Sequence, residues 1–465
     1  MKKILTFLVL LLIVLSGCNN TLNTPAYYGE FVNSERTSYK DVEGLRGTPK
    51  EVAWRKELEV SDEISFLTEA APTIDLETQK MYVVSGANAI HCIDLKTHEE
   101  VWRKSYAEIF PPDSEFDYSP VVYEDKLIVI EGFPAQQYLA AFDKNTGEFL
   151  WKSECIGNME INDTSSHPLV INGKVYIAAS SSENYKKNQG AQSGIWIFDA
   201  ETGEVLKKAY IESVAEPIVG KYRSMFPASA FLAKDGTNIY GLTRLTNDST
   251  NRTYIFLYDT LKNKFMWFEP VGEDGFKSPG YRARLAIDGN FVAVCMVGDQ
   301  WEDSEPQFFI KVFDKSSQKP LWSNISKTDR KTNPVFTFSY IAIQNNKLYA
   351  MLMDKRFVCF DLQTGKVIWE YIDQDWATES WNSLNRDANH FREEDIMISK
   401  DTAYFNVGKA IYAFDTNTGT LLWRKMVGKG YIFVNIMMVD NGLIVRYQDY
   451  KYDTSQEPST IELWM

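Results

Sequence analysis

The sequence Leu-Ala-Ala-Phe-Asp-Lys-Asn-Thr-Gly-Glu-Phe-Leu-Trp occupies residues 139–151, and the same pattern returns at 357–369 and 411–423. In each copy an alternating apolar segment leads into Asp-x-x-Thr-Gly, and a second apolar segment ends in Trp. Asp and Thr side chains accept hydrogen bonds from turn amides, and Gly adopts a positive φ without steric cost. The pattern therefore predicts two antiparallel strands, a tight turn, and a large aromatic side chain at a fixed distance after that turn.

Four further copies keep the spacing but vary the chemistry. The Trp, or the residue that replaces it, lies eight residues after the Asp, and Lys207 takes the Trp position in one copy. His98, Asn263 and Gln318 stand in the glycine position of other copies. The predicted turn and docking residues are Asp94, Trp102, Asp143, Thr146, Gly147, Trp151, Asp199, Asp259, Trp267, Asp314, Trp322, Asp361, Thr364, Gly365, Trp369, Asp415, Thr418, Gly419 and Trp423.

The Asp positions recur at roughly fifty-residue intervals, which is enough for the four short strands of one propeller blade. A second apolar hairpin precedes the block, as at 121–130, 169–177 and 341–350. Val52–Leu58 reads as a fourth strand with no partner before it, and Ile461–Trp464 reads as a third strand. We therefore expect residues 52–465 to form one all-β domain, an eight-bladed β-propeller of four-stranded antiparallel blades whose two ends complete one blade and protect the sheet edges.

The block resembles the PQQ-type (quinoprotein-like) propeller repeat, with its motif Ala-x-Asp-x-x-Thr-Gly-x-x-x-Trp, over nearly all of the chain after residue 51. The resemblance implies the fold but no activity. The repeat occurs in quinoprotein dehydrogenases and also in binding scaffolds such as the BamB-like outer-membrane assembly lipoproteins. Another kind of propeller is the alternative, although the Gly-His and Trp-Asp signature of WD40 repeats is missing.

The amino end predicts export and a lipid anchor. Lys2 and Lys3 precede an apolar run at 4–15 that is short for a membrane span, so residues 1–17 read as a signal peptide. The sequence Leu-Ser-Gly-Cys at 15–18 resembles a bacterial lipobox, which implies lipid attachment to Cys18; an ordinary signal peptide is the alternative. Residues 18–51 are expected to be a polar tether. With Asn19 next, the anchor implies the outer membrane of a diderm cell, or the outer face of the plasma membrane of a monoderm cell.

Composition and motifs argue against several classes of protein. A formal net charge of −14 disfavours nucleic-acid binding. The four histidines show no metal-ligand spacing, and His91 and His98 are interpreted as structural. Neither a Gly-x-Ser-x-Gly elbow nor a phosphate-binding loop occurs. We therefore predict no catalytic residue, metal or cofactor. Cys92, Cys295 and Cys359 sit in apolar strand patterns and are expected to be buried thiols, with one disulfide left open as an alternative.

For an enzyme of this family, the resemblance implies site residues that cannot be identified in the sequence. Dehydrogenases of the PQQ family use calcium held by carboxylate and amide side chains, an Asp base and often a disulfide of adjacent cysteines. Adjacent cysteines are absent here, and no ligand can be matched residue by residue.

Connection lengths point to one working face. We label the strands of a blade A to D from the channel outward. The A–B and C–D connections are all short, whereas the long ones join B to C or D to A and share the other face. These long segments are Ser180–Ser193, Ser213–Pro227, Arg244–Arg252, Asp299–Gln307, Asp373–Asp395 and Gln448–Ser459. The predicted binding residues on them are Trp376, Trp381, Arg386, Tyr222, Arg223 and Trp301. Plugging of the central channel by the aromatic residues is the alternative.

The combined interpretation is a non-catalytic, lipid-anchored protein of the cell envelope, monomeric, that acts as a scaffold for a protein partner, with a BamB-like role in envelope or outer-membrane protein assembly as one form. The alternatives are a PQQ- and calcium-dependent dehydrogenase and a surface lipoprotein that binds a glycan through tryptophans such as Trp376.

Overall fold

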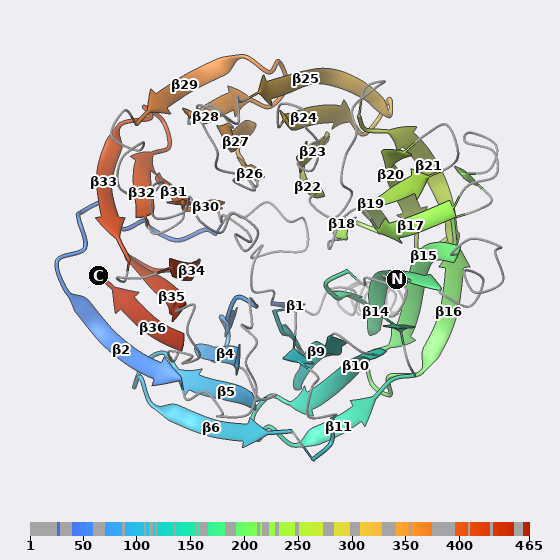
Figure 1. Ribbon diagram of the computed structural model, residues 1–465, viewed down its shortest axis with the longest axis horizontal. Coiled ribbons are helices and arrows are strands. Elements are labelled where there is room, and N and C mark those ends of the chain that lie inside the picture. The colour runs from blue at the N-terminus through green and yellow to red at the C-terminus, as the bar shows by residue number, and fades with distance from the viewer. Residues whose placement is uncertain are drawn as a thin grey trace, which may run out of the picture.

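The computed structural model is a ring of eight β-sheets around a central axis (Figure 1). It describes residues 26–27, 40–58, 70–85, 89–106, 108–110, 115–116, 119–133, 136–154, 156–158, 166–181, 192–211, 214–215, 223–227, 232–246, 251–272, 283–297, 307–327, 341–352, 356–373, 396–407, 410–427, 431–450 and 459–465. The prediction of an all-β, eight-bladed propeller is confirmed. Among the described residues none forms a helix with the length and hydropathy needed to cross a membrane.

Each blade is an antiparallel sheet whose strands run outward in chain order. The first blade contains β3 (Thr73–Asp75), β4 (Lys80–Ser85), β5 (Ala89–Asp94) and β6 (Glu100–Ser105), and the second contains β8 (Val121–Tyr123), β9 (Lys126–Phe133), β10 (Gln136–Asp143) and β11 (Phe149–Lys152). The third contains β13 (Leu169–Ile171), β14 (Lys174–Ser181), β15 (Gln192–Asp199) and β16 (Val205–Tyr210), the fourth contains β18 (Ala233–Asp235), β19 (Asn238–Thr246), β20 (Asn251–Asp259) and β21 (Lys264–Pro270), and the fifth contains β22 (Ala283–Asp288), β23 (Phe291–Val297), β24 (Gln307–Asp314) and β25 (Lys319–Lys327). The sixth contains β26 (Ile341–Gln344), β27 (Lys347–Leu352), β28 (Arg356–Asp361) and β29 (Val367–Ile372), and the seventh contains β30 (Ile396–Ile398), β31 (Thr402–Val407), β32 (Ala410–Asp415) and β33 (Leu421–Met426). Short extra strands are β1 (Ala26–Tyr27), β7 (Glu115–Phe116), β12 (Gly157–Asn158) and β17 (Arg223–Pro227).

The eighth blade joins the two ends of the propeller. It contains β34 (Tyr431–Val439), β35 (Gly442–Tyr450), β36 (Ser459–Trp464) and, as its outer strand, β2 (Val52–Leu58). β2 pairs antiparallel with β36, from Val52 opposite Trp464 to Leu58 opposite Ser459. The predicted closure between these two segments is therefore confirmed.

The turn residues act as the sequence predicts. The Oδ1 atom of Asp143 accepts hydrogen bonds from the amides of Asn145 and Thr146, each at 2.8 Å. Gly147 has a φ of 72° and closes the turn. Asp94, Asp199, Asp259, Asp314, Asp361 and Asp415 cap their own turns through the same Oδ1 atom. His98, Asn263 and Gln318 also take positive φ values in the glycine position.

A β-bulge in every outer strand aims the docking side chain at the next blade. In the second blade Trp151 pairs with Ala141 and Phe149 pairs with Phe142, so Leu150 is the extra residue. A bulge bends its strand and redirects side chains, and here Leu150 is 43% exposed while Trp151 is buried. The register shift recurs at the matching position of the other seven blades. Bulges on outer strands also discourage edge-to-edge pairing.

The docking tryptophan covers the turn of the following blade. A Cβ atom on Gly365 would lie 2.7 Å from Cδ2 of Trp322, so the ring needs a glycine beneath it. Its Nε1 atom donates a hydrogen bond of 2.8 Å to the carbonyl of Leu362, one residue after the turn Asp. Where Lys207 replaces the tryptophan, its Nζ atom donates to the carbonyl of Asn263 at 3.1 Å. The lysine thus keeps a polar link where the ring is missing.

The closing blade has no C–D turn of its own, and an N-terminal segment takes its place. Residues 40–50, which we call the strap, cross from blade seven to blade eight. Trp423 donates from Nε1 to the carbonyl of Leu45 at 2.8 Å, whereas Trp102, Trp322 and Trp369 donate to a turn carbonyl of the next blade. The Nζ atom of Lys40 donates to the carbonyl of Met438, and the Lys40 amide donates to Ile398. Residues 40–50 therefore pack on the propeller, although residues 18–51 are expected to be a tether.

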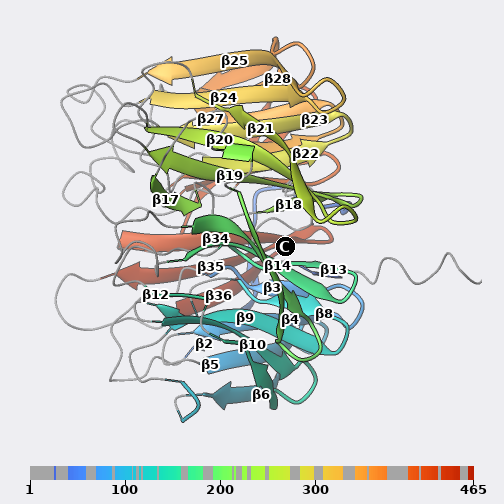
Figure 2. The ribbon, with the colours of Figure 1, turned by 90° about the vertical axis from the view of Figure 1, so that its right-hand side faces the viewer.

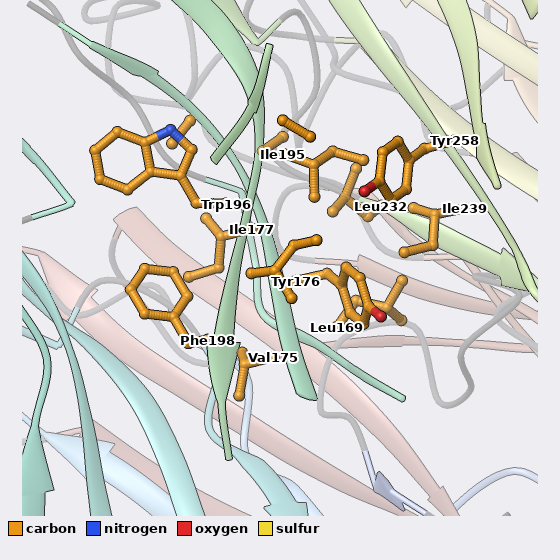
Figure 3. Close-up of a cluster of buried hydrophobic side chains, with 14 of the residues drawn as sticks. Leu169, Val175, Tyr176, Ile177, Ile195, Trp196, Phe198, Leu232, Ile239 and Tyr258 are labelled. Carbon is orange, nitrogen blue, oxygen red and sulfur yellow. The ribbon is translucent and has the colours of Figure 1, made fainter. Parts of the chain in front are cut away.

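The hydrophobic core lies between the blades, because every blade is covered on both faces. On β28, Phe357 and Cys359 pack toward blade seven, whereas Val358 and Phe360 pack toward blade five. Both sets are buried, which explains why the inner strands read as continuous apolar runs. Figure 3 shows one such core, where Tyr176 faces the fourth blade. The prediction that three cysteines are buried free thiols is confirmed for Cys92, Cys295 and Cys359.

Candidate binding face

The disc has two chemically different faces, which we define by their connections. The turn face carries the A–B hairpins and the C–D turns, and the loop face carries the B–C and D–A connections. Edge-on, the strands run from one face to the other, with hairpins such as that of β13 and β14 gathered on one side (Figure 2). The longest intervals between described strands all fall on the loop face. One expectation is wrong: β19 and β20 extend to Thr246 and Asn251, so the segment Arg244–Arg252 is mostly strand.

Most of the predicted binding residues lie outside the described part of the chain. These are Tyr222, Trp301, Trp376, Trp381 and Arg386, together with the anchor residue Cys18. Arg223 begins β17, and its Cα atom pairs with Thr246 at the far end of β19. The backbone of Arg223 therefore lies at the loop face, and the other residues stay predictions.

A buried carboxylate fixes the base of the segment that carries Trp376 and Trp381. Asp373, which follows β29, is buried and accepts a hydrogen bond of 2.9 Å from the hydroxyl of Tyr412 in the next blade. Arg424 pairs with the same oxygen atom at 3.3 Å and lies over the Tyr412 ring. Burial first, and then Asp373, raise the pKa of Tyr412, so its hydroxyl remains a donor. This cluster holds Asp373 at the loop-face end of the sixth blade.

Similar contacts join other blades near the loop face. Lys208 in the third blade lies over the Trp196 ring at 3.9 Å and pairs with Glu154 of the second blade at 2.7 Å. Lys152 lies 3.9 Å from the centroid of the Tyr138 ring and 4.7 Å from that of Phe110, which follows the first blade. Cations over aromatic rings contribute about 0.5–1 kcal/mol at partly exposed sites. These contacts stiffen the rim of the candidate binding face.

Three side chains that contact one another in the first blade follow the order Ser, His and Glu, which is the order of a hydrolytic triad. Ser85 Oγ lies 3.0 Å from Nε2 of His91, and His91 Nδ1 lies 2.7 Å from Glu100 Oε1. Ser85 is 3% exposed and His91 is 1% exposed. Lys56 of the closing blade pairs with Glu100 at 3.4 Å. These contacts therefore span the closure between blades eight and one, and the burial of the side chains agrees with the structural interpretation of His91.

The pH dependence of folding should report on His91. Burial lowers the pKa of His91 below 6.5, although Glu100 opposes the shift; Arg103 and Lys56 lower the pKa further. As the pH falls, His91 therefore takes up a proton more readily in the unfolded chain than in the folded one. Its contribution to the free energy of unfolding is fully present above about pH 6.5 and decreases as the pH falls below that value. We expect His91→Gln to flatten the dependence of the unfolding free energy on pH between 7.5 and 5.5. Urea titrations at each pH measure it. An unchanged slope would contradict this expectation.

The described residues do not supply a cradle for the calcium ion that PQQ enzymes use. Calcium takes six to eight oxygen ligands, with carboxylates prominent among them. Within the described ranges no three His, Cys, Asp or Glu side chains converge on one point. We therefore assign no step to a metal or a quinone.

Comparison with known proteins agrees with the repeat. Residues 48–213 match the family described as outer membrane protein assembly factor BamB. None of the curated proteins matches the sequence. The fold is similar to that of BamB from Moraxella catarrhalis, with 14% identity, a TM-score of 0.51, and coverage of 89% of this chain and 98% of that one.

Enzymes share the same fold. A quinohemoprotein alcohol dehydrogenase from Comamonas testosteroni is 14% identical with a TM-score of 0.60, and the match covers 96% of this chain and 81% of that chain. A europium-containing methanol dehydrogenase is 13% identical with a TM-score of 0.62, over 95% of this chain and 98% of that one. At these identities the likeness concerns the fold alone.

Proposed function

We propose that this chain, a β-propeller of the PQQ repeat type, is a non-catalytic lipoprotein of the cell envelope that binds a protein partner with its loop face. The match of residues 48–213 to the family described as outer membrane protein assembly factor BamB carries the proposal, because that description names a factor in protein assembly. A role in outer-membrane protein assembly follows in a diderm host. Cys18 would hold the anchor, and the residues after Asp373 would supply the main contacts.

The geometry around Asp373 supports a binding role for the segment that follows. Aromatic and Arg side chains dominate interface hot spots, where truncation costs about 2 kcal/mol or more. Trp376, Trp381 and Arg386 belong to these residue types and follow an anchored, buried carboxylate. These side chains would therefore be the hot-spot residues for a partner at the loop face.

We expect the double substitution Trp376→Ala and Trp381→Ala to weaken partner capture while the melting temperature stays within a degree or two. Crosslinking in membranes followed by affinity purification measures capture, and calorimetry measures stability. The matched control is Leu150→Ala with Leu206→Ala, two exposed residues of outer strands that should leave capture unchanged. If capture survives the loop substitutions but is lost with changes in the A–B hairpins, the binding face is wrongly assigned.

The anchor is tested separately. Cys18→Ala should abolish lipid attachment, so that the protein stays unprocessed or is released from membranes. Detergent-phase partitioning and intact-mass spectrometry measure the outcome. Full retention of the variant in the detergent phase would contradict a lipid anchor at Cys18.

The shared fold of the alcohol dehydrogenases supports a second candidate, a PQQ- and calcium-dependent dehydrogenase. Purified protein incubated with PQQ and calcium should show neither stoichiometric binding nor alcohol-dependent dye reduction. Either signal would overturn the scaffold proposal. A glycan-binding role through Trp376 and Trp381 predicts instead that the double variant loses retention on a polysaccharide column.

A further inference from the structure

We infer that the turn face is the side of the propeller that lies toward the membrane, and that the loop face points away from it. The inference rests on the proposed lipid anchor at Cys18. It adds an orientation, which decides where a partner can approach. Three described pieces of the N-terminal chain carry it: β1, the strap and the start of β2.

The direction of β1 gives the first constraint. β1 pairs antiparallel with β8, with Ala26 opposite Tyr123 and Tyr27 opposite Val122. β8 runs toward the turn face, because Tyr123 leads directly into the A–B hairpin. Ala26, the described residue nearest to Cys18 in the sequence, is therefore at the turn-face end of its pair.

The strap gives the second constraint. The amide of Lys40 bonds the carbonyl of Ile398, the last residue of β30 before its hairpin on the turn face. Further along, Gly44 bonds the side chain of Asp401, and Arg46 pairs with Asp401 and Asp415, all within A–B or C–D turns. The strap therefore lies over the turn face, and Figure 1 shows its path from blade seven toward β2.

Chain length makes the conclusion quantitative. Cys18 precedes Ala26 by eight residues, which span at most about 29 Å when fully extended. β19 and β20 contain nine residues each, and nine residues in a strand cover roughly 30 Å between the faces. A return from the turn-face end of β1 to the loop face would consume all of this length. The lipid at Cys18 can therefore reach a bilayer readily only on the turn-face side.

Ion pairs on the turn face indicate that the acyl anchor, and not direct binding of this face to lipid, holds the propeller at the membrane. Lys144 pairs with Asp75 at 2.9 Å, and Lys315 pairs with Asp235 at 2.6 Å. Such pairs leave less positive charge to attract anionic headgroups. The acyl anchor would hold this face near the membrane, and the loop face would stay accessible to a protein partner.

Energy transfer to labelled lipid tests the orientation. Gln363 and Ile372 are exposed residues of one blade: Gln363 lies in the C–D turn on the turn face, and Ile372 ends β29 at the loop face. Each is replaced by Cys in a Cys155→Ser background and labelled with a donor dye; Cys92, Cys295 and Cys359 are buried. The lipidated protein is reconstituted into phosphatidylethanolamine and phosphatidylglycerol vesicles that carry an acceptor on a trace of the lipid. Flotation of the same sample measures anchoring.

We expect a larger loss of donor emission from position 363 than from position 372, and no loss in detergent micelles without acceptor lipid. Equal losses, or a larger loss from position 372, in protein that floats with the vesicles would overturn the orientation and leave the anchor intact. Protein that carries Cys18 but does not float would overturn the anchor, and the orientation would fall with it.

Discussion

Removal of residues 460–465 is expected to lower the melting temperature by many degrees and to broaden the unfolding transition. β36 lies between β35 and β2, so its loss leaves Val52–Leu58 without a partner strand. Trp464 is 1% exposed and Ile461 is fully buried. Truncation of one buried Trp to Ala costs about 3–5 kcal/mol, so loss of the strand should cost more.

The control for this truncation is removal of Met465 alone, because that side chain is 50% exposed and follows the last strand. We expect the control to melt within a degree or two of the full chain. Calorimetry measures both variants, and binding of a dye to exposed apolar surface measures opening of the eighth blade. An unchanged melting temperature after removal of residues 460–465 would contradict closure of the ring by β36 and β2.

Local turn chemistry explains why the propeller could be predicted from the sequence. The positions of Asp143 and Gly147 are fixed by hydrogen bonds and a positive φ within the turn, so a local sequence pattern predicts them. Val52–Leu58 matches only the outer strand of the repeat. It predicts closure of the ring, because an outer strand without inner strands needs a partner from elsewhere in the chain. The bulge beside Trp151 could not be predicted, because the unpaired residue is an ordinary apolar one and the sequence pattern does not show the register between the two strands.

Contacts between blades were harder to predict. Asp373 and Tyr412 are 39 positions apart, and Asp373 and Arg424 are 51 apart, so no local pattern relates them. The repeat does contain a signal, because Tyr412, Trp196 and His91 each lie three residues before a turn Asp. Tyr412 bonds Asp373 of the neighbouring blade, the Trp196 ring lies under the Nζ atom of Lys208, and His91 contacts Ser85 and Glu100. Aligning the copies at this position would have indicated where blades contact near the loop face. The binding residues themselves, such as Trp376, remain predictions.

The strap could not be predicted because its fit depends on tertiary contacts. Residues 40–50 show neither strand alternation nor a turn motif, and they were interpreted as part of a polar tether. Val42 and Leu45 pack against the core between blades seven and eight. Burial alone would raise the pKa of Asp415, but Arg46 and the amides of Thr418 and Asn417 overcome that effect and lower the pKa to about 2. That contribution to stability is present above about pH 4 and is lost as the pH falls toward 2.

The substitution Gly44→Ala should detach the strap and destabilise the propeller. A Cβ atom at position 44 would overlap the side chains of Ser399 and Thr402, which are buried in blade seven. Relief of the overlap must move the strap away from Asp401, and Trp423 then loses its acceptor at Leu45. Overpacking of this kind costs about 1–3 kcal/mol.

Gly47→Ala is the matched control in the same segment. A Cβ atom at position 47 meets nothing within 4 Å, so the change removes backbone freedom without a clash. It should leave stability unchanged or raise it by up to about 1 kcal/mol. Urea unfolding measures both variants. If Gly44→Ala and Gly47→Ala unfold at the same urea concentration, the strap does not stabilise the closing blade.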